Sequence, residues 1–268
     1  KNVLKRKSKR VLSIVLAVAM IVGLFPIAAF AEGGEPATVD KSLPAAVGGV
    51  ITLTKDTTIS SLPLNSTGET VIDLNGKTLT YEGGTVSLQD GQVLTFRDSS
   101  VSGDKRGGKL KLTGVKSTSA ALNPESGATV NASNITVECS GSAFFPRGDA
   151  AAVNIINCDV TAAVYCVATN AATVDNYDVV ITLSGSTFVA NAADNDNCPI
   201  MINVPGTLNM DSCKVTGDRM GVLVRAGDAN ITNCEIIMTG TFDESNKGYT
   251  DTTDWGSGNE VPMAALIV

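Results

Sequence analysis

The sequence predicts an all-β protein built as a single right-handed parallel β-helix, a solenoid, preceded by a signal-peptide helix. Three observations predict this fold. A seven-residue pattern recurs between Asp73 and Ile236, its copies are spaced at about one solenoid coil, and a second apolar segment lies between successive copies. Repeats of roughly 20–50 residues are typical of stacked architectures, in which each unit buries its apolar face against its neighbours.

The repeated pattern consists of apolar columns separated by a bend. The seven copies begin at Asp73, Thr95, Asn131, Asn154, Thr182, Asn209 and Asn230. The second and seventh positions are apolar in every copy, and the third and sixth are mostly polar. The fourth position holds Gly, Asp, Asn or Ser, a set rich in residues that tolerate a left-handed backbone. We therefore expect the chain to turn a corner at this position in every coil.

The second apolar segment indicates that each coil has at least two strands and two corners. Examples are Thr85–Leu88, Ala163–Val167, Pro199–Val204 and Gly221–Val224, and Gly91, Gly127, Gly206 and Gly227 mark turns. About eight coils are expected from residue 50 onward. A β-sandwich is the alternative, because it also combines short strands with Gly-rich turns. The recurrence of Asn and Gly in one column favours the β-helix.

Two segments resemble a known group of proteins. Val71–Leu79 (VIDLNGKTL) looks like the opening coil of bacterial secreted or surface proteins with a pectate-lyase-like right-handed parallel β-helix. Leu94–Ser100, which leads into Gly107–Leu112, is similar to their second coil. The resemblance covers about residues 50–268. The group includes adhesins, polysaccharide-degrading enzymes and uncharacterised secreted proteins, so the resemblance implies the fold rather than the function.

The N-terminal segment has the features of an export signal. Six basic residues lie within the first ten, an apolar run follows from Val11 to Phe30, and Ala29–Ala31 fits a cleavage site before Glu32. The predicted divisions are a signal peptide at 1–31, a flexible lead-in at 32–49 and a β-helix at 50–268. Because Ala264–Val268 reads as an uncapped strand, we expect the helix to be truncated at its C-terminus. An uncleaved membrane anchor is the alternative to the signal peptide.

The net charge of the chain and its predicted location limit the classes of molecule that it can bind. Without the six basic residues of the leader, 14 Lys and Arg face 27 Asp and Glu. Such an acidic chain repels nucleic acid, so none is expected as a partner. The predicted location is secreted or attached to the surface of a bacterial cell, with membrane contact only through the signal segment if it stays uncleaved.

The six cysteines are predicted to be buried reduced thiols. Cys158, Cys213 and Cys234 share the inward fifth position, where stacked side chains point in parallel and do not easily reach disulfide geometry. Cys139, Cys166 and Cys198 have no assigned position. We predict no metal site, because the sequence has no C-x-x-C motif and no histidine.

The sequence offers no recognisable catalytic group. The absence of histidine excludes Ser-His-Asp and Cys-His chemistry in this chain. Asp159 and Glu235 share the sixth position, but two coils lie between them, and a gap of roughly 14 Å is too wide for a glycosidase pair. Asp194–Asn197 resembles the start of a calcium loop without its glycine and is interpreted as a turn. We predict no catalytic residue and no cofactor.

Three further features have open interpretations. Arg147 and Arg225 either face a shared groove or are solvated corner residues. The insertion Ser102–Ser119 is basic, and Lys109–Leu112 suggests an extra strand within it. The insertion Thr239–Val261 carries the candidate ligand-binding residues Tyr249, Asp251, Asp254 and Trp255. Long loops on a rigid stack often bind ligands, although Trp255 and Tyr249 could instead pin the loop to the coils.

The predicted function is an exported, non-catalytic β-helical scaffold of adhesin-like character. Its expected partner is an extracellular glycan or a host or cell-wall surface, because aromatic and acidic side chains together suit sugar rings and hydroxyl groups. The alternative is a polysaccharide lyase or glycoside hydrolase of the pectate-lyase-like fold whose active coils are missing or unrecognised.

Overall fold

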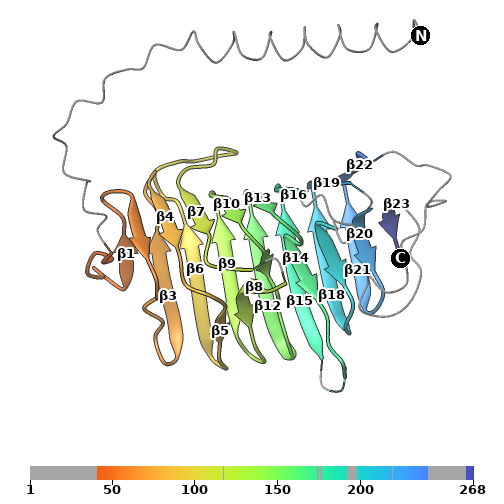
Figure 1. The fold of residues 1–268 in the computed structure, drawn as a ribbon, viewed down its shortest axis with the longest axis horizontal. Helices are drawn as coiled ribbons and strands as arrows, with labels where there is room; N and C mark the ends of the chain where they lie inside the picture. Colours follow the sequence, from red (N-terminus) through yellow and green to blue (C-terminus); the bar gives the residue numbers. More distant parts are fainter. Residues whose placement is uncertain are drawn as a thin grey trace, which may run out of the picture. The chain divides into compact units, whose positions relative to one another are not determined.

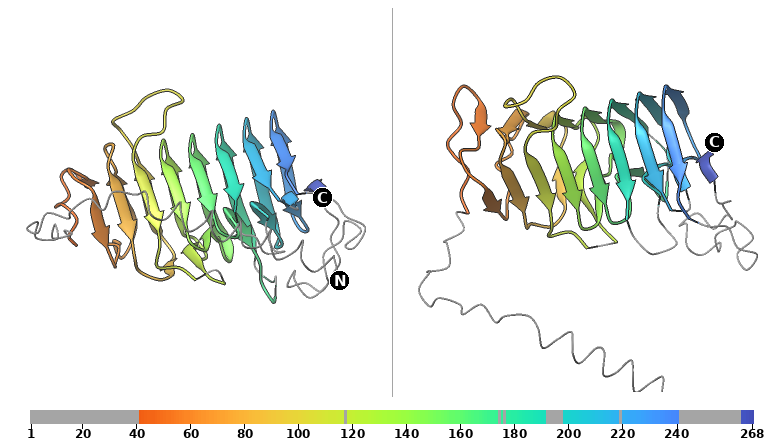
Figure 2. Two further views of the ribbon diagram at one scale, coloured as in Figure 1. Left: turned by 45° about the horizontal axis from the view of Figure 1, so that its top comes forward. Right: turned by 90° about the horizontal axis from the view of Figure 1, so that it is seen from above.

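The computed structural model describes residues 41–116, 118–173, 175, 177–191, 198–218, 220–240 and 264–268. Every regular element in these ranges is a β-strand. The strands form three sheets, and within each sheet the neighbours follow chain order and pair in parallel. Figure 1 shows this succession of strands, and Figure 2 shows it from two further directions.

The three sheets, here named A, B and C, contain eight, eight and seven strands. Sheet A consists of β1 (Val50–Thr52), β3 (Gly68–Asp73), β6 (Gln92–Arg97), β9 (Thr129–Ser133), β12 (Asp149–Ile156), β15 (Asp178–Ser184), β18 (Gly206–Asp211) and β21 (Asp228–Thr232). Sheet B consists of β2 (Thr57–Ile59), β4 (Thr78–Tyr81), β7 (Lys109–Leu112), β10 (Thr136–Cys139), β13 (Asp159–Ala162), β16 (Thr187–Ala190), β19 (Lys214–Gly217) and β22 (Glu235–Met238). Sheet C consists of β5 (Val86–Leu88), β8 (Ala120–Pro124), β11 (Ser142–Phe144), β14 (Val167–Thr169), β17 (Ile200–Ile202), β20 (Met220–Val224) and β23 (Ala264–Ile267).

One coil comprises a strand of sheet A, a corner, a strand of sheet B, a connection and a strand of sheet C. Sheets A and B each gain a strand in all eight coils of the described chain, which agrees with the predicted number. This arrangement fits a parallel β-helix. The predicted second apolar segments supply sheet C, so every described coil after the first has three strands rather than the minimum of two.

The corner between sheets A and B is the predicted bend. Its residue has a left-handed backbone in five coils: φ is 59° at Asn134, 53° at Asn157, 55° at Gly185, 55° at Ser212 and 53° at Asn233. One residue with positive φ reverses the alternation of side chains, so apolar residues on both sides of it point inward. The column of Asn, Gly and Ser therefore separates two sheets.

Three sequence assignments need correction at the first two copies of the repeat. Val71, not Asp73, pairs with Thr95, because the corner between Asp73 of β3 and Thr78 of β4 is four residues long. In the third coil, which holds the second copy of the repeat, Leu110 takes the seventh position in place of Val101, since the insertion enters at the corner itself. Lys109–Leu112 is consequently the regular sheet B strand of its coil and not an extra one.

The inward side chains form one continuous core along the stack. In sheets A and B burial alternates along most strands, as in β6 and β10, so one face of each sheet is inside and the other is outside. Sheet C differs, because β8, β11, β14, β17 and β20 are buried at every position. A second apolar cluster there contains Ala168, Cys198, Met201, Met220 and Leu223. The regular faces open to solvent therefore belong to sheets A and B.

All six cysteines are free thiols, as predicted. Five are buried, and Cys234, in the last coil, is partly buried. Burial raises the pKa of the Cys139, Cys158 and Cys213 thiols to about 11 and that of Cys198 to about 12. These groups stay protonated near neutral pH and act as apolar fillers.

Candidate functional site

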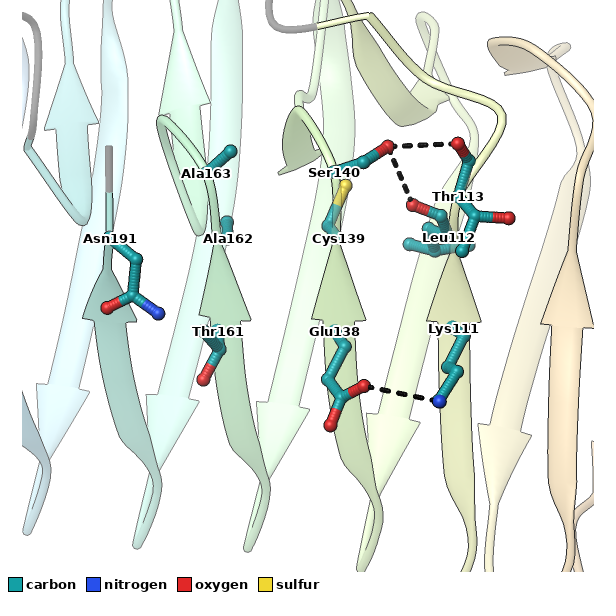
Figure 3. A pocket seen from close by; sticks show the side chains of 10 residues that line it. All are labelled: Lys111, Leu112, Thr113, Glu138, Cys139, Ser140, Thr161, Ala162, Ala163 and Asn191. Carbon is teal, nitrogen blue, oxygen red and sulfur yellow. Dashed lines mark hydrogen bonds and ion pairs between the residues drawn. The ribbon is translucent and has the colours of Figure 1, made fainter. Parts of the chain in front are cut away.

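A groove lies where the strands of sheet B end (Figure 3). It has a volume of about 340 Å³ and crosses four coils, from β7 to the residue after β16. Its lining residues are Lys111, Leu112, Thr113, Glu138, Cys139, Ser140, Thr161, Ala162, Ala163 and Asn191. They lie side by side because successive strands of sheet B stack in register, with Lys111 paired to Glu138 and Glu138 to Thr161.

One carboxylate and two amines meet at the mouth of the groove. The Glu138 carboxylate lies 2.5 Å from Lys109 Nζ and 3.8 Å from Lys111 Nζ. All three side chains are about two-fifths exposed, so each pair contributes little to stability. The arrangement neutralises one unit of negative charge and leaves the mouth slightly basic in an acidic protein.

The inner wall of the groove carries no activated nucleophile. Ser140 Oγ lies 2.7 Å from the backbone oxygen of Val115 and 3.1 Å from that of Thr113, so its hydroxyl is used to hold the connection that follows β7. Figure 3 shows Ser140 directed toward Thr113 and away from Glu138. Cys139 is buried, and its raised pKa keeps it a thiol. Nucleophilic catalysis needs a depressed pKa or an adjacent base, and these two residues have neither in the described groove.

The insertion between β6 and β7 is held by buried polar contacts at its base. Asp98 is 1% exposed, and its carboxylate accepts backbone N–H groups from Gly76 at 2.6 Å, Gly108 at 2.5 Å and Ser100 at 2.8 Å. Burial alone would raise the pKa of this carboxyl. The hydrogen bonds from the Ser100 hydroxyl and these amides outweigh burial, so the pKa lies below its ordinary value. Asp98 is structural.

Arg106 ties the same insertion to two later coils. Its guanidinium donates to Asn157 Oδ1 and to the Gly185 backbone oxygen at 2.7 Å, and its Nε lies 3.3 Å from Asp159 Oδ1. Asn157 Nδ2 in turn donates to the Gly103 backbone oxygen at 2.8 Å. The insertion, drawn in yellow beyond the sheet ends in Figure 2, thus lies against the corners of sheets A and B. No local sequence pattern predicts this contact, because its partners are more than fifty residues apart.

The two predicted acidic positions of the sixth column are where the sequence placed them. The register runs from Asp159 through Thr187 and Lys214 to Glu235. Asp159 is paired with Arg106, and Glu235 with Lys214 at 3.0 Å. The two carboxylates thus belong to separate ion pairs and do not face one another as an acid and a base.

Amide side chains form a ladder on the outer face of sheet A that the sequence interpretation overlooked. Asn131 Nδ2 donates to Thr95 Oγ1 at 3.0 Å, and Asn154 Nδ2 donates to Asn131 Oδ1 at 2.9 Å. Asn230 Nδ2 donates to Asn209 Oδ1 at 3.0 Å in the last two coils. The signal was present in the first position of the repeat, which is Asn in four of seven copies.

Arg147 and Arg225 occupy one column at the end of sheet C. Backbone hydrogen bonds continue the sheet register past the strands and align Glu125, Arg147, Asn170, Asn203 and Arg225. Asn170 and Asn203 separate the two arginines, and Asn203 Nδ2 donates to Asn170 Oδ1 at 2.9 Å. Arg147 is exposed and stacks over the Phe145 ring at 4.9 Å. The two guanidinium groups therefore do not converge on one ligand-sized site.

The predicted ligand-binding residues Tyr249, Asp251, Asp254 and Trp255 lie outside the described residues, as does the calcium-loop-like segment Asp194–Asn197. Within the described ranges, no group of three or more metal-binding side chains is close enough to hold a metal ion. No helix in those ranges is long and apolar enough to span a membrane. Searches against family models, curated proteins and solved structures find no match to this chain.

Proposed function

We propose that this chain is an exported, non-catalytic scaffold at a bacterial cell surface, adhesin-like in character, that binds extracellular glycans. The observation that carries the proposal is the parallel pairing of neighbouring strands in sheets A and B over eight coils, with one register shift between Asp149 and Ala152. It turns the outer faces into rigid, repetitive surfaces on which the same position recurs once per coil, every ~4.8 Å. A repetitive surface of this kind suits a repetitive partner, and polysaccharides are the repetitive polymers outside a bacterial cell.

The finer features of the proposal come from the sequence. The residue pattern of Val71–Leu79 supports a right-handed, pectate-lyase-like β-helix, and the basic and apolar leader supports export. Tyr249 and Trp255, with Asp251 and Asp254, remain the proposed sugar contacts of the long insertion. Aromatic rings pack against the CH faces of sugars, while carboxylates accept hydroxyl protons.

The test starts from the full chain expressed in a bacterial host. Intact mass and N-terminal sequencing are expected to give a released chain that begins at Glu32, whereas an uncleaved leader would leave it in the membrane fraction. The recovered protein is then applied to a panel of neutral and acidic glycans. Retention on at least one neutral glycan without release of reducing or unsaturated sugars is the expected result, and no retention on any member would reject the proposal.

The runner-up function is a polysaccharide lyase or glycoside hydrolase, and the groove at the end of sheet B is the observation in its favour. Lys111 and Glu138 place an amine and a carboxylate in one groove across adjacent coils. Released sugar products in the assay above would support this alternative. Their loss in Lys111→Ala and Glu138→Gln, with the fold retained, would assign the activity to the groove.

A further inference from the structure

The outer face of sheet A has a patch without ionisable side chains at the centre of the stack. The strands β9, β12 and β15 are adjacent in sheet A (Figure 1). Each contributes three outward residues in register. The nine residues are Thr129, Asn131, Ser133, Ala152, Asn154, Ile156, Val180, Thr182 and Ser184. All are partly or fully exposed, and we call them the neutral patch. In a chain of net charge −7, such a patch is a local departure from the acidic surface.

The amides of the neutral patch have hydrogen-bonding capacity beyond the ladder. An Asn side chain offers two N–H donors and two acceptor lone pairs. Asn131 uses one donor toward Thr95 and one lone pair toward Asn154, and Asn154 uses one donor toward Asn131. Each amide thus retains a donor and an acceptor. The ladder also fixes the rotamers, which lowers the entropy lost when a ligand binds.

Apolar side chains lie directly beside these amides. Ile156 is 50% exposed and Val180 is 38% exposed, and they flank the central row that contains Asn154 and Thr182. An alternation of fixed amides and exposed aliphatic groups matches the two surfaces of a sugar ring, its hydroxyl edge and its CH face. A peptide or nucleic acid ligand would find neither an unpaired strand edge nor a basic group in the patch.

Charge at the patch margin selects among glycans. Asp149 and Asp178 are exposed and paired at the starts of β12 and β15, along one edge of the patch, and a register shift between Asp149 and Ala152 separates this pair from the patch. Two carboxylates there disfavour uronic acids and other anionic sugars and can accept hydroxyl protons from neutral ones. From this geometry we infer that the neutral patch binds a neutral linear polysaccharide lying along the stacking axis, with successive sugars on successive coils. The inference rests on the proposed glycan-binding function and assigns it a surface other than the long insertion.

Affinity electrophoresis of the full exported chain in gels that contain mixed-linkage β-glucan tests the inference, with polygalacturonate as the anionic comparison. Asn131→Ala combined with Asn154→Ala is expected to weaken β-glucan retardation by about tenfold, since each lost hydrogen bond weakens binding severalfold. Asn170→Ala combined with Asn203→Ala removes a matched amide pair at the end of sheet C and is expected to change nothing.

Ile156→Ala serves as the second variant, because an exposed side chain can be truncated without loss of the fold. Ile156→Ala is expected to weaken β-glucan retardation severalfold. If the Asn131/Asn154 double variant does not fold, this single variant tests the inference by itself. Equal retardation of wild type, the Asn131/Asn154 variant and Ile156→Ala would overturn the inference and leave glycan binding elsewhere on the chain. No retardation of the wild type by β-glucan would overturn the inference, and no binding to any glycan would reject the proposed function as well. A change of oligomeric state instead of retardation would identify the patch as a contact between copies and overturn the inference.

Discussion

The Asp98 carboxylate shows how single residues hold this solenoid at its least regular corner. Asp98 stands at the position where the five later coils have a residue with a left-handed backbone. Its carboxylate accepts hydrogen bonds from the backbone amides of Gly76, Ser100 and Gly108. A buried carboxylate is stable only when such donors replace its hydration. One side chain thereby anchors both ends of an insertion that would otherwise leave the corner open.

We predict that Asp98→Asn lowers the free energy of unfolding at pH 7 by about 1–3 kcal/mol, because an amide NH₂ would face donor groups. The lowered pKa gives stability that is fully present above the unfolded value of about 3.9 and lost as pH falls through the folded pKa. The difference between wild type and variant should therefore shrink below about pH 4. Urea denaturation at pH 7 and pH 3 measures it, with Asp228→Asn, an exposed carboxyl, as control. A difference that is constant with pH would contradict this role.

At the scale of the element, the corner between sheets A and B governs the register. It needs one residue of positive φ, and the chain meets this need with Asn, Gly or Ser. Asn adopts the left-handed conformation at less cost than other residues with a side chain, and β-branched residues do so at the greatest cost. Because the corner is a single residue, a change there acts on two strands at once.

Gly185 allows a clean test, because φ is 55° and an added Cβ would have no heavy atom within 4 Å. Gly185→Asn is expected to change the free energy of unfolding by less than about 0.5 kcal/mol, whereas Gly185→Val should lower it by about 1–2 kcal/mol. Thr187→Val, on the outer face of the neighbouring strand, is the control for an added apolar valine side chain, because threonine is already β-branched. Thermal denaturation monitored by circular dichroism measures all three, and equal effects of Asn and Val would refute the backbone explanation.

At the scale of the whole molecule, the coils contact mainly their neighbours, so stability is distributed along the stack. The inner coils are covered on both sides, while β21 and β22, in the last coil of the described residues, have no fully buried position. Solenoids of this kind open from their ends, because an end coil loses only one interface. The cysteines lie in coils four to eight and report on this opening.

Native-state labelling with iodoacetamide is therefore expected to follow position along the stack. Cys234 should react first and Cys213 next, and Cys166, which is fully buried and whose pKa burial also raises, should react among the last. Peptide mass spectrometry of timed samples gives the order, and denatured protein without reductant should show six free thiols. Equal labelling rates at all six cysteines would indicate a single global opening. Fewer than six free thiols in the denatured protein would show that some cysteines form disulfides and would contradict the assignment of free thiols.

The sequence by itself determined the stacked parallel strands, the approximate number of coils and the corner residue of the five later copies, because these follow from side-chain alternation and from the steric cost of positive φ. It also determined the column shared by Asp159 and Glu235, since register follows once the corners are aligned. Only the tertiary structure decided that the first repeat begins at Val71 and that Leu110 replaces Val101. Because the number of corner residues varies between these coils, the spacing of apolar residues does not reveal where one strand ends and the next begins. The contacts of Arg106 and the amide ladder of Asn131 and Asn154 likewise depend on which coils are neighbours, and that neighbourhood is a property of the stack rather than of any segment.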